Sequence, residues 1–271
     1  MYTYIVMAVF VALLGLTFGS FVNAAVWRIH TKRSRSLLSD TSECSHCGHK
    51  LAWFDLIPVL SWVLLRGKCR YCQKKIVDTP LPEIGVAVYF LGSFLVWPGQ
   101  FATALSIVDF VFWLVFGVLL AILFVYDLRY MLLPNKIVFT LIGLGVLQLL
   151  FHIGFAPHSF GSLIADAILG IASITGIYLL LYVISFGRWV GFGDVKLSVF
   201  LGMVLANWQL GLLTFFLANL IGCIIILPGL LTRTLTRSSK VPFGPFLILG
   251  FILSMLFGRL AIGWYLSMLY L

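Results

Sequence analysis

Long apolar segments constrain the fold of this chain more than any other feature. Eight of them are recognisable, at about residues 3–27, 81–98, 104–126, 137–155, 162–186, 193–206, 208–230 and 243–265. A helix needs about 20 apolar residues to cross the roughly 30 Å of hydrocarbon in a bilayer. Because 62% of the residues are hydrophobic and only 10% are charged, a soluble domain is excluded. The sequence predicts an all-α polytopic membrane protein with about eight transmembrane helices.

The basic residues are distributed unevenly between the loops. Of the 18 Lys and Arg residues, ten lie between Arg28 and Lys75, whereas residues 99–103, 156–161 and 206–208 contain none. Cytoplasmic loops of membrane proteins carry an excess of Lys and Arg, so we expect residues 28–80 in the cytoplasm and both termini outside. This bias explains the net charge of +9, and no nucleic-acid partner is expected.

Three regions follow from this topology. Residues 1–27 form a first transmembrane helix. The segment lacks the basic start of a signal peptide, and its apolar run is longer than the apolar region of a signal peptide. Residues 28–80 form a small cytoplasmic loop domain. Residues 81–271 form the remaining membrane core.

Four of the five cysteines stand in the cytoplasmic loop as two Cys-x-x-Cys pairs, Cys44 with Cys47 and Cys69 with Cys72. Each pair presents two thiolates from one tight turn, and two turns together give the tetrahedral set that Zn²⁺ prefers. The 21 residues between the pairs slightly exceed the usual spacing. A reducing cytoplasm favours metal over disulfides, so we expect a structural zinc that holds together a loop too small for a core of its own. A catalytic zinc and a redox-active pair are the alternatives.

Two aspartates, Asp127 and Asp194, stand at the ends of apolar segments in a chain with only nine acidic residues. Both lie next to basic loops, and therefore at the same membrane face. Two carboxyl groups about 3 Å apart cannot both ionise, so one can take a proton from water while the other donates to a carbonyl oxygen. The pair favours aspartyl proteolysis. The alternatives are helix caps or pairs with Arg129 and Lys196, and proton-coupled transport.

Other residues near these segments support the interpretation or have simpler roles. Gly191 and Gly193 precede Asp194, and glycine there allows the backbone to approach a substrate strand closely. Lys196 follows Asp194 by two residues and is interpreted as marking the membrane interface. Asp109 and Asp166 stand near the starts of segments and are interpreted as caps or solvated ends.

Five blocks of the sequence, in order along the chain, resemble the type IV prepilin peptidases, a branch of the Gly-x-Gly-Asp aspartyl membrane proteases. The blocks are Gly15 to Asn23 with Arg28, the paired cysteine loop with Asp55 to Trp62 and Arg66 to Cys69, Pro82-Glu83, Asp127 with Leu133-Pro134, and Gly191 to Leu197. The stretch from Val241 to Phe246 also looks like the family's proline-bracketed segment.

The resemblance implies an activity, a location and partners. Such enzymes act in the bacterial inner membrane, where they cut a short basic leader from type IV prepilin or pseudopilin precursors at the cytoplasmic face. Many also methylate the new N-terminal amine with S-adenosylmethionine. Besides these precursors, membrane lipid is an expected partner. A proton-coupled transporter and a non-enzymatic assembly factor for a pilus or secretion machine remain alternatives.

The resemblance also implies roles for particular residues. Asp127 and Asp194 would be the catalytic dyad, with Gly191 and Gly193 completing their motif. The cysteines that would carry the family's zinc are Cys44, Cys47, Cys69 and Cys72. Methylation rests on the resemblance alone, and Gly67 and Glu83 mark the region where we expect the methyl donor.

Overall fold

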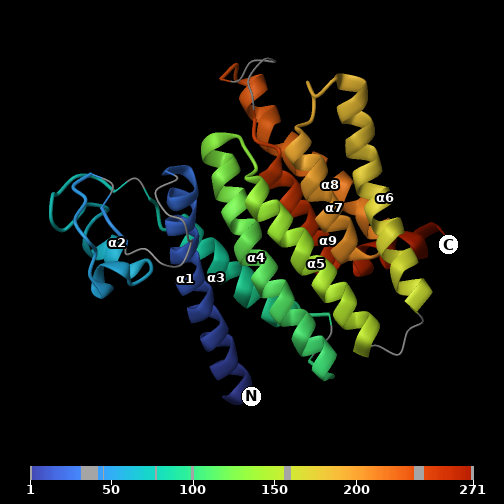
Figure 1. The fold of residues 1–271 in the computed structure, drawn as a ribbon, viewed down its shortest axis with the longest axis horizontal. Coiled ribbons are helices and arrows are strands. Elements are labelled where there is room, and N and C mark those ends of the chain that lie inside the picture. The colour runs from blue at the N-terminus through green and yellow to red at the C-terminus, as the bar shows by residue number, and fades with distance from the viewer. Residues whose placement is uncertain are drawn as a thin grey trace. The chain divides into compact units, whose positions relative to one another are not determined.

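The computed structural model describes residues 2–31, 42–44, 46–76, 78–98, 101–155, 160–234 and 241–269. Eight helices in these ranges correspond to the eight predicted segments, and the described residues contain only isolated β-bridges. The helices are α1 (Tyr2–Thr31), α3 (Leu81–Val96), α4 (Ala104–Tyr130), α5 (Asn135–Phe155), α6 (Phe160–Ser185), α7 (Phe192–Leu205), α8 (Trp208–Leu231) and α9 (Gly244–Leu269) (Figure 1). The predicted all-α fold is confirmed.

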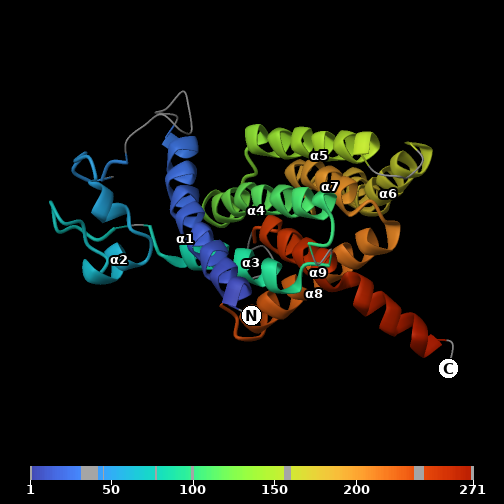
Figure 2. The ribbon, with the colours of Figure 1, turned by 90° about the horizontal axis from the view of Figure 1, so that it is seen from below.

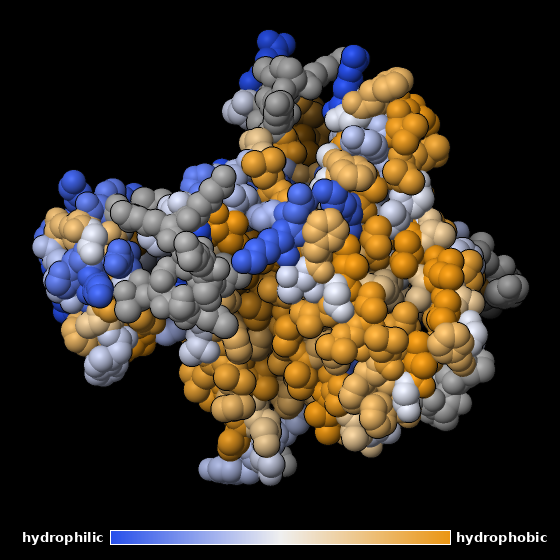
Figure 3. Space-filling model, viewed as in Figure 1, coloured by the Kyte–Doolittle hydropathy of each residue, from blue (hydrophilic) through white to orange (hydrophobic). Residues whose placement is uncertain are grey.

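Six of these helices, α1, α4, α5, α6, α8 and α9, are long and apolar enough to cross a membrane. Much of their apolar surface faces outwards: only 22% of the apolar window in α1 is buried. Figure 3 shows hydrophobic residues over most of the visible face of the helices. A surface of this kind requires lipid around it, and the protein is therefore a multi-pass membrane protein.

Two of the predicted segments form shorter helices. α3 has 16 residues and α7 has 14, which correspond to lengths of about 24 and 21 Å at 1.5 Å per residue. α7 ends where Ala206 adopts a left-handed conformation, and the side chain of Asn207 then caps α8 by accepting hydrogen bonds from two backbone N–H groups. α7 contacts α5, α6, α8 and α9, and Figure 2 shows it beside α5 and α6. It is a buried helix of the bundle.

The chain divides into two compact units. Unit 1 comprises residues 1–97 and 113–125, and unit 2 comprises residues 98–112 and 126–271. The middle of α4 belongs to unit 1, and both of its ends belong to unit 2. The division at residues 27 and 80 suggested by the sequence remains a prediction.

In unit 1, α1 and α3 pack side by side through glycine (Figure 1). A Cβ atom on Gly15 would lie 2.6 Å from the Cα atom of Ala87, and one on Gly19 would overlap the backbone of Glu83. Glycines four residues apart let two helix backbones touch, as in other membrane helix pairs. This crossing fixes the start of α3, and with it Glu83, against α1.

In unit 2, glycine also sets the contact between α6 and α7. A Cβ atom on Gly202 of α7 would lie 2.5 Å from the carbonyl oxygen of Gly170 and 2.6 Å from the Cα atom of Ile171. The hydroxyl of Ser198 donates to the hydroxyl of Thr175 one turn further along, at 3.1 Å. Together, these contacts pack α7, which carries Asp194, closely against α6.

The segment of unit 1 between α1 and α3 contains two short helices, η1 (Trp53–Leu56) and α2 (Leu60–Leu64). Each Cys-x-x-Cys pair stands at the tip of a small hairpin closed by one bridge, between Glu43 and Lys50 in the first and Lys68 and Lys75 in the second. The loop is therefore built from two copies of the same local structure, one on each side of the short helices.

Candidate active site and metal centre

The two cysteine hairpins repeat one hydrogen-bonding pattern. The first cysteine of each pair donates its N–H to the carbonyl five residues later, and its own carbonyl accepts from the residue four later. The position after the second cysteine is left-handed in both, with φ of 69° at Gly48 and 58° at Gln73. This turn places both sulfurs of a pair on the same side of the hairpin.

The structure brings together all four predicted metal-binding cysteines. Their Sγ atoms lie within 4.8 Å of one another, and those of Cys44 and Cys72 are 4.0 Å apart. A zinc ion with four sulfur ligands at about 2.3 Å would separate them by roughly 3.8 Å. Burial acts to raise the pKa of Cys44, but N–H groups of Cys47 and His46 outweigh it and lower that pKa to about 6. The donor set fits a metal ion that binds thiolate.

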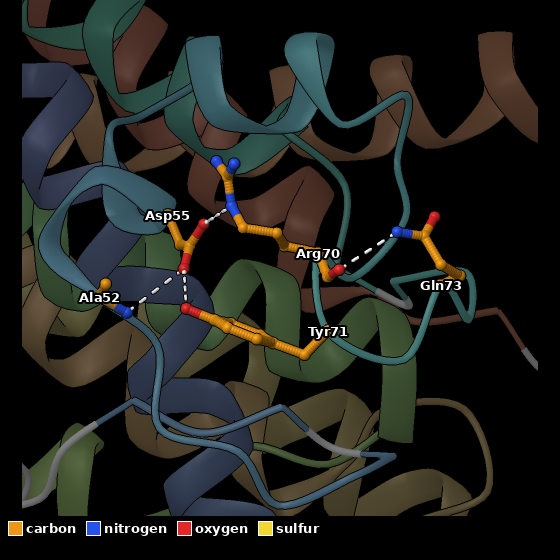
Figure 4. A network of polar contacts seen from close by, with 5 residues as sticks. All are labelled: Ala52, Asp55, Arg70, Tyr71 and Gln73. Atoms are coloured by element: carbon orange, nitrogen blue, oxygen red, sulfur yellow. Dashed lines mark hydrogen bonds and ion pairs between the residues drawn. The ribbon is translucent and has the colours of Figure 1, made fainter.

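Asp55 connects the short helices to the second hairpin (Figure 4). Its carboxylate accepts from Arg70 Nε at 2.8 Å, the Tyr71 hydroxyl at 3.1 Å and the Ala52 N–H at 3.3 Å. The side chain of Asp55 is only 2% exposed. Burial acts to raise its pKa, but the hydrogen bonds from Arg70, Tyr71 and Ala52 outweigh that effect and lower the pKa below its ordinary value. Asp55 therefore holds together, as a carboxylate, the loop that carries the four cysteines (residues 42–76, the metal loop).

A pocket in unit 1 lies between the end of α1, the start of α3 and the metal loop. Its lining includes the indoles of Trp27 and Trp62 and the carboxylates of Glu43 and Glu83. One of the two residues in the predicted methyl-donor region, Glu83, thus faces this pocket. The pocket offers aromatic surface and negative charge beside the cysteine cluster.

Glu83 also supports a strained turn of the loop. Val59 has a φ of 60°, which is a rare conformation for a β-branched residue. The turn at Val59 is closed by the N–H of Leu60, which donates to the carbonyl of Pro58. The N–H of Val59 donates to Glu83 Oε2 at 2.5 Å. The hydroxyl of Ser20 bonds the same carboxylate. Glu83 therefore fixes the loop to α1 and α3.

Gly67, the other predicted methyl-donor residue, does not line the pocket. It has a φ of 69°, and a Cβ atom there would lie 3.0 Å from the indole ring of Trp62. Trp62 does line the pocket, and its buried Nε1–H bonds no described residue. Gly67 thus acts on the pocket through the position of this ring.

The two predicted catalytic aspartates both belong to unit 2 and are buried. Asp127, in the last turn of α4, is 5% exposed, and Asp194, in the first turn of α7, is 9% exposed. Their carboxyl groups lie close enough to interact electrostatically. α4 ends just after Asp127, at Met131 in a left-handed conformation, so the carboxyl stands where the helix stops. Both carboxyl groups are therefore buried within electrostatic range of each other.

Gly244 holds the carboxyl of Asp127. Its N–H donates to Asp127 Oδ2 at 3.0 Å, and a Cβ atom on Gly244 would lie 2.7 Å from the same oxygen. Sequence reasoning gave this residue no role, although it lies in the proline-bracketed stretch that resembles the family. A glycine between two prolines at the start of an apolar segment was the only available signal.

The motif glycines shape the start of α7 next to Asp194. Gly191 is the N-cap of α7, and its carbonyl accepts the N–H of Asp194 at 3.1 Å. A Cβ atom on Gly193 would lie 3.2 Å from the side chain of Leu133. Glycine at position 193 therefore allows α7 to pack closely on the connection that follows Asp127.

Lys196 bonds a residue of α5 and is not a partner for Asp194. Its Nζ donates to Asn135 Oδ1 at 2.8 Å and lies 4.8 Å from the ring centre of Phe192. The ammonium is thus held at an aromatic, partly exposed edge of unit 2, and its place at the membrane interface remains a prediction.

One sequence interpretation of an acidic residue is wrong. Asp109 is neither a cap nor a solvated end: His152 Nε2 lies 2.7 Å from Asp109 Oδ1, and Gln148 donates to the same oxygen at 2.9 Å. Both partners belong to α5, so Asp109 ties α4 to that helix. Asp166 is exposed on α6, as expected.

These features define a class: a membrane-embedded protein with two buried carboxyl groups and a separate cluster of four cysteines that could hold a metal ion. Comparison with known proteins identifies the family. The model for the bacterial peptidase A24 N-terminal domain matches residues 13–97, and that for the type IV leader peptidase family matches residues 114–227. The chain belongs to the type IV leader peptidase family.

Curated relatives cover nearly the whole chain. The prepilin leader peptidase/N-methyltransferase of Dichelobacter nodosus is 30% identical, over 92% of this chain and 91% of the relative. The proteins of the same name from Aeromonas hydrophila and Pseudomonas putida are each 29% identical, over 95% and 90% of this chain and 93% and 88% of the relatives. No solved structure matches.

Proposed function

We propose that this protein is an aspartyl endopeptidase that removes the leader from prepilin-like precursors and methylates the new N-terminal residue. The observation that carries the proposal is the pair of buried carboxyl groups, Asp127 and Asp194, which stand at the ends of two apolar helices and interact electrostatically. The names of the relatives, which combine both activities, support it.

The carboxyl pair can hydrolyse a peptide bond without a covalent intermediate. One carboxylate takes a proton from water, whose oxygen bonds to the scissile carbonyl carbon, while the other carboxyl gives its proton to the carbonyl oxygen. The C–N bond of the resulting gem-diol then breaks. The nitrogen takes up the first proton, and a gem-diol hydroxyl returns a proton to the second carboxylate. Both groups thereby regain their starting states.

The distribution of charge supports an orientation. Residues 28–80 and the other basic loops would face the cytoplasm, and the dyad would then lie near the cytoplasmic face of a bacterial inner membrane. A prepilin or pseudopilin has a basic leader followed by an apolar helix. That helix can lie in the bilayer beside the protein while the bond between leader and helix reaches Asp127 and Asp194.

Zinc is the metal that the four thiolates fit best, because tetrahedral sulfur sites favour it. In this closed set of Cys44, Cys47, Cys69 and Cys72, zinc would be structural. Four thiolates fill the tetrahedral shell that zinc prefers and leave no open position for a reacting group.

The unit 1 pocket is the proposed site for S-adenosylmethionine, which would supply the methyl group for the new N-terminal amine. The donor carries a sulfonium cation and an aromatic base. The carboxylates of Glu43 and Glu83 and the indoles of Trp27 and Trp62 are suited to both, because cations bind to aromatic faces and to carboxylates.

The test is to incubate the purified protein with a synthetic prepilin in detergent and to weigh the products, with and without S-adenosylmethionine. The proposal predicts loss of the leader in both reactions and a further gain of about one methylene only with the donor. An uncut precursor, under conditions where a relative cuts it, would contradict the peptidase assignment. A cut but never methylated product would contradict the methyltransferase assignment alone.

A further inference from the structure

Tyr178 of α6 is a buried polar residue that the mechanism above does not use. Its side chain is 1% exposed, and its hydroxyl forms no hydrogen bond with any described residue. A buried hydroxyl without a partner destabilises a folded protein. Such a group therefore calls for an explanation, and one explanation is a partner that arrives with the substrate.

The packing of α6 against α7 places Tyr178 level with Asp194. The two helices run in opposite directions, and the hydroxyls of Ser198 and Thr175 meet one turn to one side. On the other side, the rings of Phe192 and Tyr182 lie 5.2 Å apart. Tyr178 and Asp194 fall between these two contacts, and the two side chains interact electrostatically.

The ring of Tyr178 is held in position by aromatic neighbours. Its centre lies 5.4 Å from that of Phe215 in α8 and 5.8 Å from that of Phe243. Phe243 directly precedes Gly244, whose N–H binds Asp127. The ring thus packs on the segment that positions one aspartate, and the tyrosine interacts electrostatically with the other.

We propose that the hydroxyl of Tyr178 is a catalytic hydrogen-bond donor to the scissile carbonyl oxygen of the bound substrate. This inference rests on the proposed aspartate dyad. As water adds to the carbonyl, negative charge develops on this oxygen, and a donor fixed in a buried site stabilises it without having to reorganise. The tyrosine keeps its proton throughout, and the proton transfers remain with Asp127 and Asp194.

The decisive variant is Tyr178→Phe, which keeps the ring and removes only the hydroxyl. We expect kcat for precursor cleavage to fall by about 10²-fold, as for the loss of one donor to a developing oxyanion, with KM nearly unchanged. Because the lost hydroxyl bonds no described residue, the melting temperature of the variant should be no lower than that of the wild type.

The matched control is Tyr89→Phe in unit 1. The hydroxyl of Tyr89 donates to the carbonyl oxygen of Trp113 at 2.8 Å, so its removal breaks a satisfied hydrogen bond. This variant should melt at a lower temperature and keep the wild-type kcat per folded molecule. Opposite effects of the two changes on stability and rate would separate a catalytic hydroxyl from a structural one.

A second readout uses a peptide that carries a secondary alcohol in place of the scissile amide. Tyr178→Phe should weaken its inhibition about as much as it lowers kcat, while leaving KM for the precursor unchanged. An unchanged kcat in Tyr178→Phe would overturn the proposal. A lower kcat accompanied by a lower melting temperature would also overturn it, because the hydroxyl would then be structural.

The proposed aspartate dyad and the proposed role of Tyr178 can be refuted separately. If Asp127→Asn and Asp194→Asn abolish cleavage but Tyr178→Phe cleaves normally, only the role of Tyr178 is refuted. If either aspartate variant cleaves at the normal rate, the proposed dyad is refuted and the inference about Tyr178 falls with it.

Discussion

Gly244 shows how one backbone position shapes the proposed active site. Its N–H orients the carboxyl of Asp127, and the space that a side chain would occupy is filled by that same carboxyl. Glycine is thus required here by close approach, whereas a Cβ atom on Gly263 in the same helix would meet no atom within 4 Å. The two glycines offer a direct comparison.

Gly244→Ala should displace the carboxyl of Asp127 from its position near Asp194. Because misplacement of a catalytic group by about 1 Å can cost roughly 10²-fold in rate, we expect a loss of that order in kcat/KM for precursor cleavage. Gly263→Ala should cleave like the wild type. Normal activity of Gly244→Ala would show that this glycine does not position the aspartate.

At the scale of the helices, uniform hydrophobicity explains what could be predicted and what could not. The apolar segments located α5 and α9 to within a few residues, at 137–155 against Asn135–Phe155 and 243–265 against Gly244–Leu269. Helices that are apolar on all sides have no periodic pattern that reveals which face is packed. The sequence therefore could not place Asp109 against α5.

The same limit applies to the candidate site. Asp127 and Asp194 were predictable because acids are rare near hydrocarbon, and the four cysteines because their spacing is local. The bond from Gly244 to Asp127 joins residues far apart in the chain, and the position of Tyr178 depends on how α6 packs on α7. Such long-range contacts leave no local pattern in one sequence.

The glycine crossing of α1 and α3 gives a prediction about stability. Gly19→Ala should force the two helices apart, because its Cβ atom would overlap the backbone of Glu83. We expect a loss of about 1–3 kcal/mol, typical of overpacking, measured by thermal or denaturant unfolding in detergent. Gly92→Ala, in the open part of α3, should be neutral or slightly stabilising. Equal stability of the two variants would refute the close crossing.

At the scale of the whole molecule, the two proposed activities fall in different units. The cysteine cluster and the pocket belong to unit 1, and both aspartates belong to unit 2. The two family models match residues 13–97 and 114–227, which separate the same two sets of residues. The two activities should therefore be separable by mutation.

Cys69→Ser removes a buried ligand of the cluster and should lower bound zinc to well below one equivalent. Because the loop then loses the link between its two hairpins, we expect methylation to be lost while leader cleavage is affected much less. Metal content by elemental analysis and product masses would measure both. Cys223→Ser, at an exposed position of α8, is the control. Equal loss of cleavage and methylation in Cys69→Ser would contradict the assignment of the two activities to different units.

The most direct test of the paired-carboxyl site is a double-mutant comparison of Asp127→Asn and Asp194→Asn in precursor cleavage, with exposed Asp166→Asn as the control. Because the two groups act in one proton-transfer step, each single change should abolish cleavage, and the double variant should be no slower than either. Asp166→Asn should cleave normally. A variant lacking either carboxyl that still cleaves at the wild-type rate would contradict the paired-carboxyl mechanism.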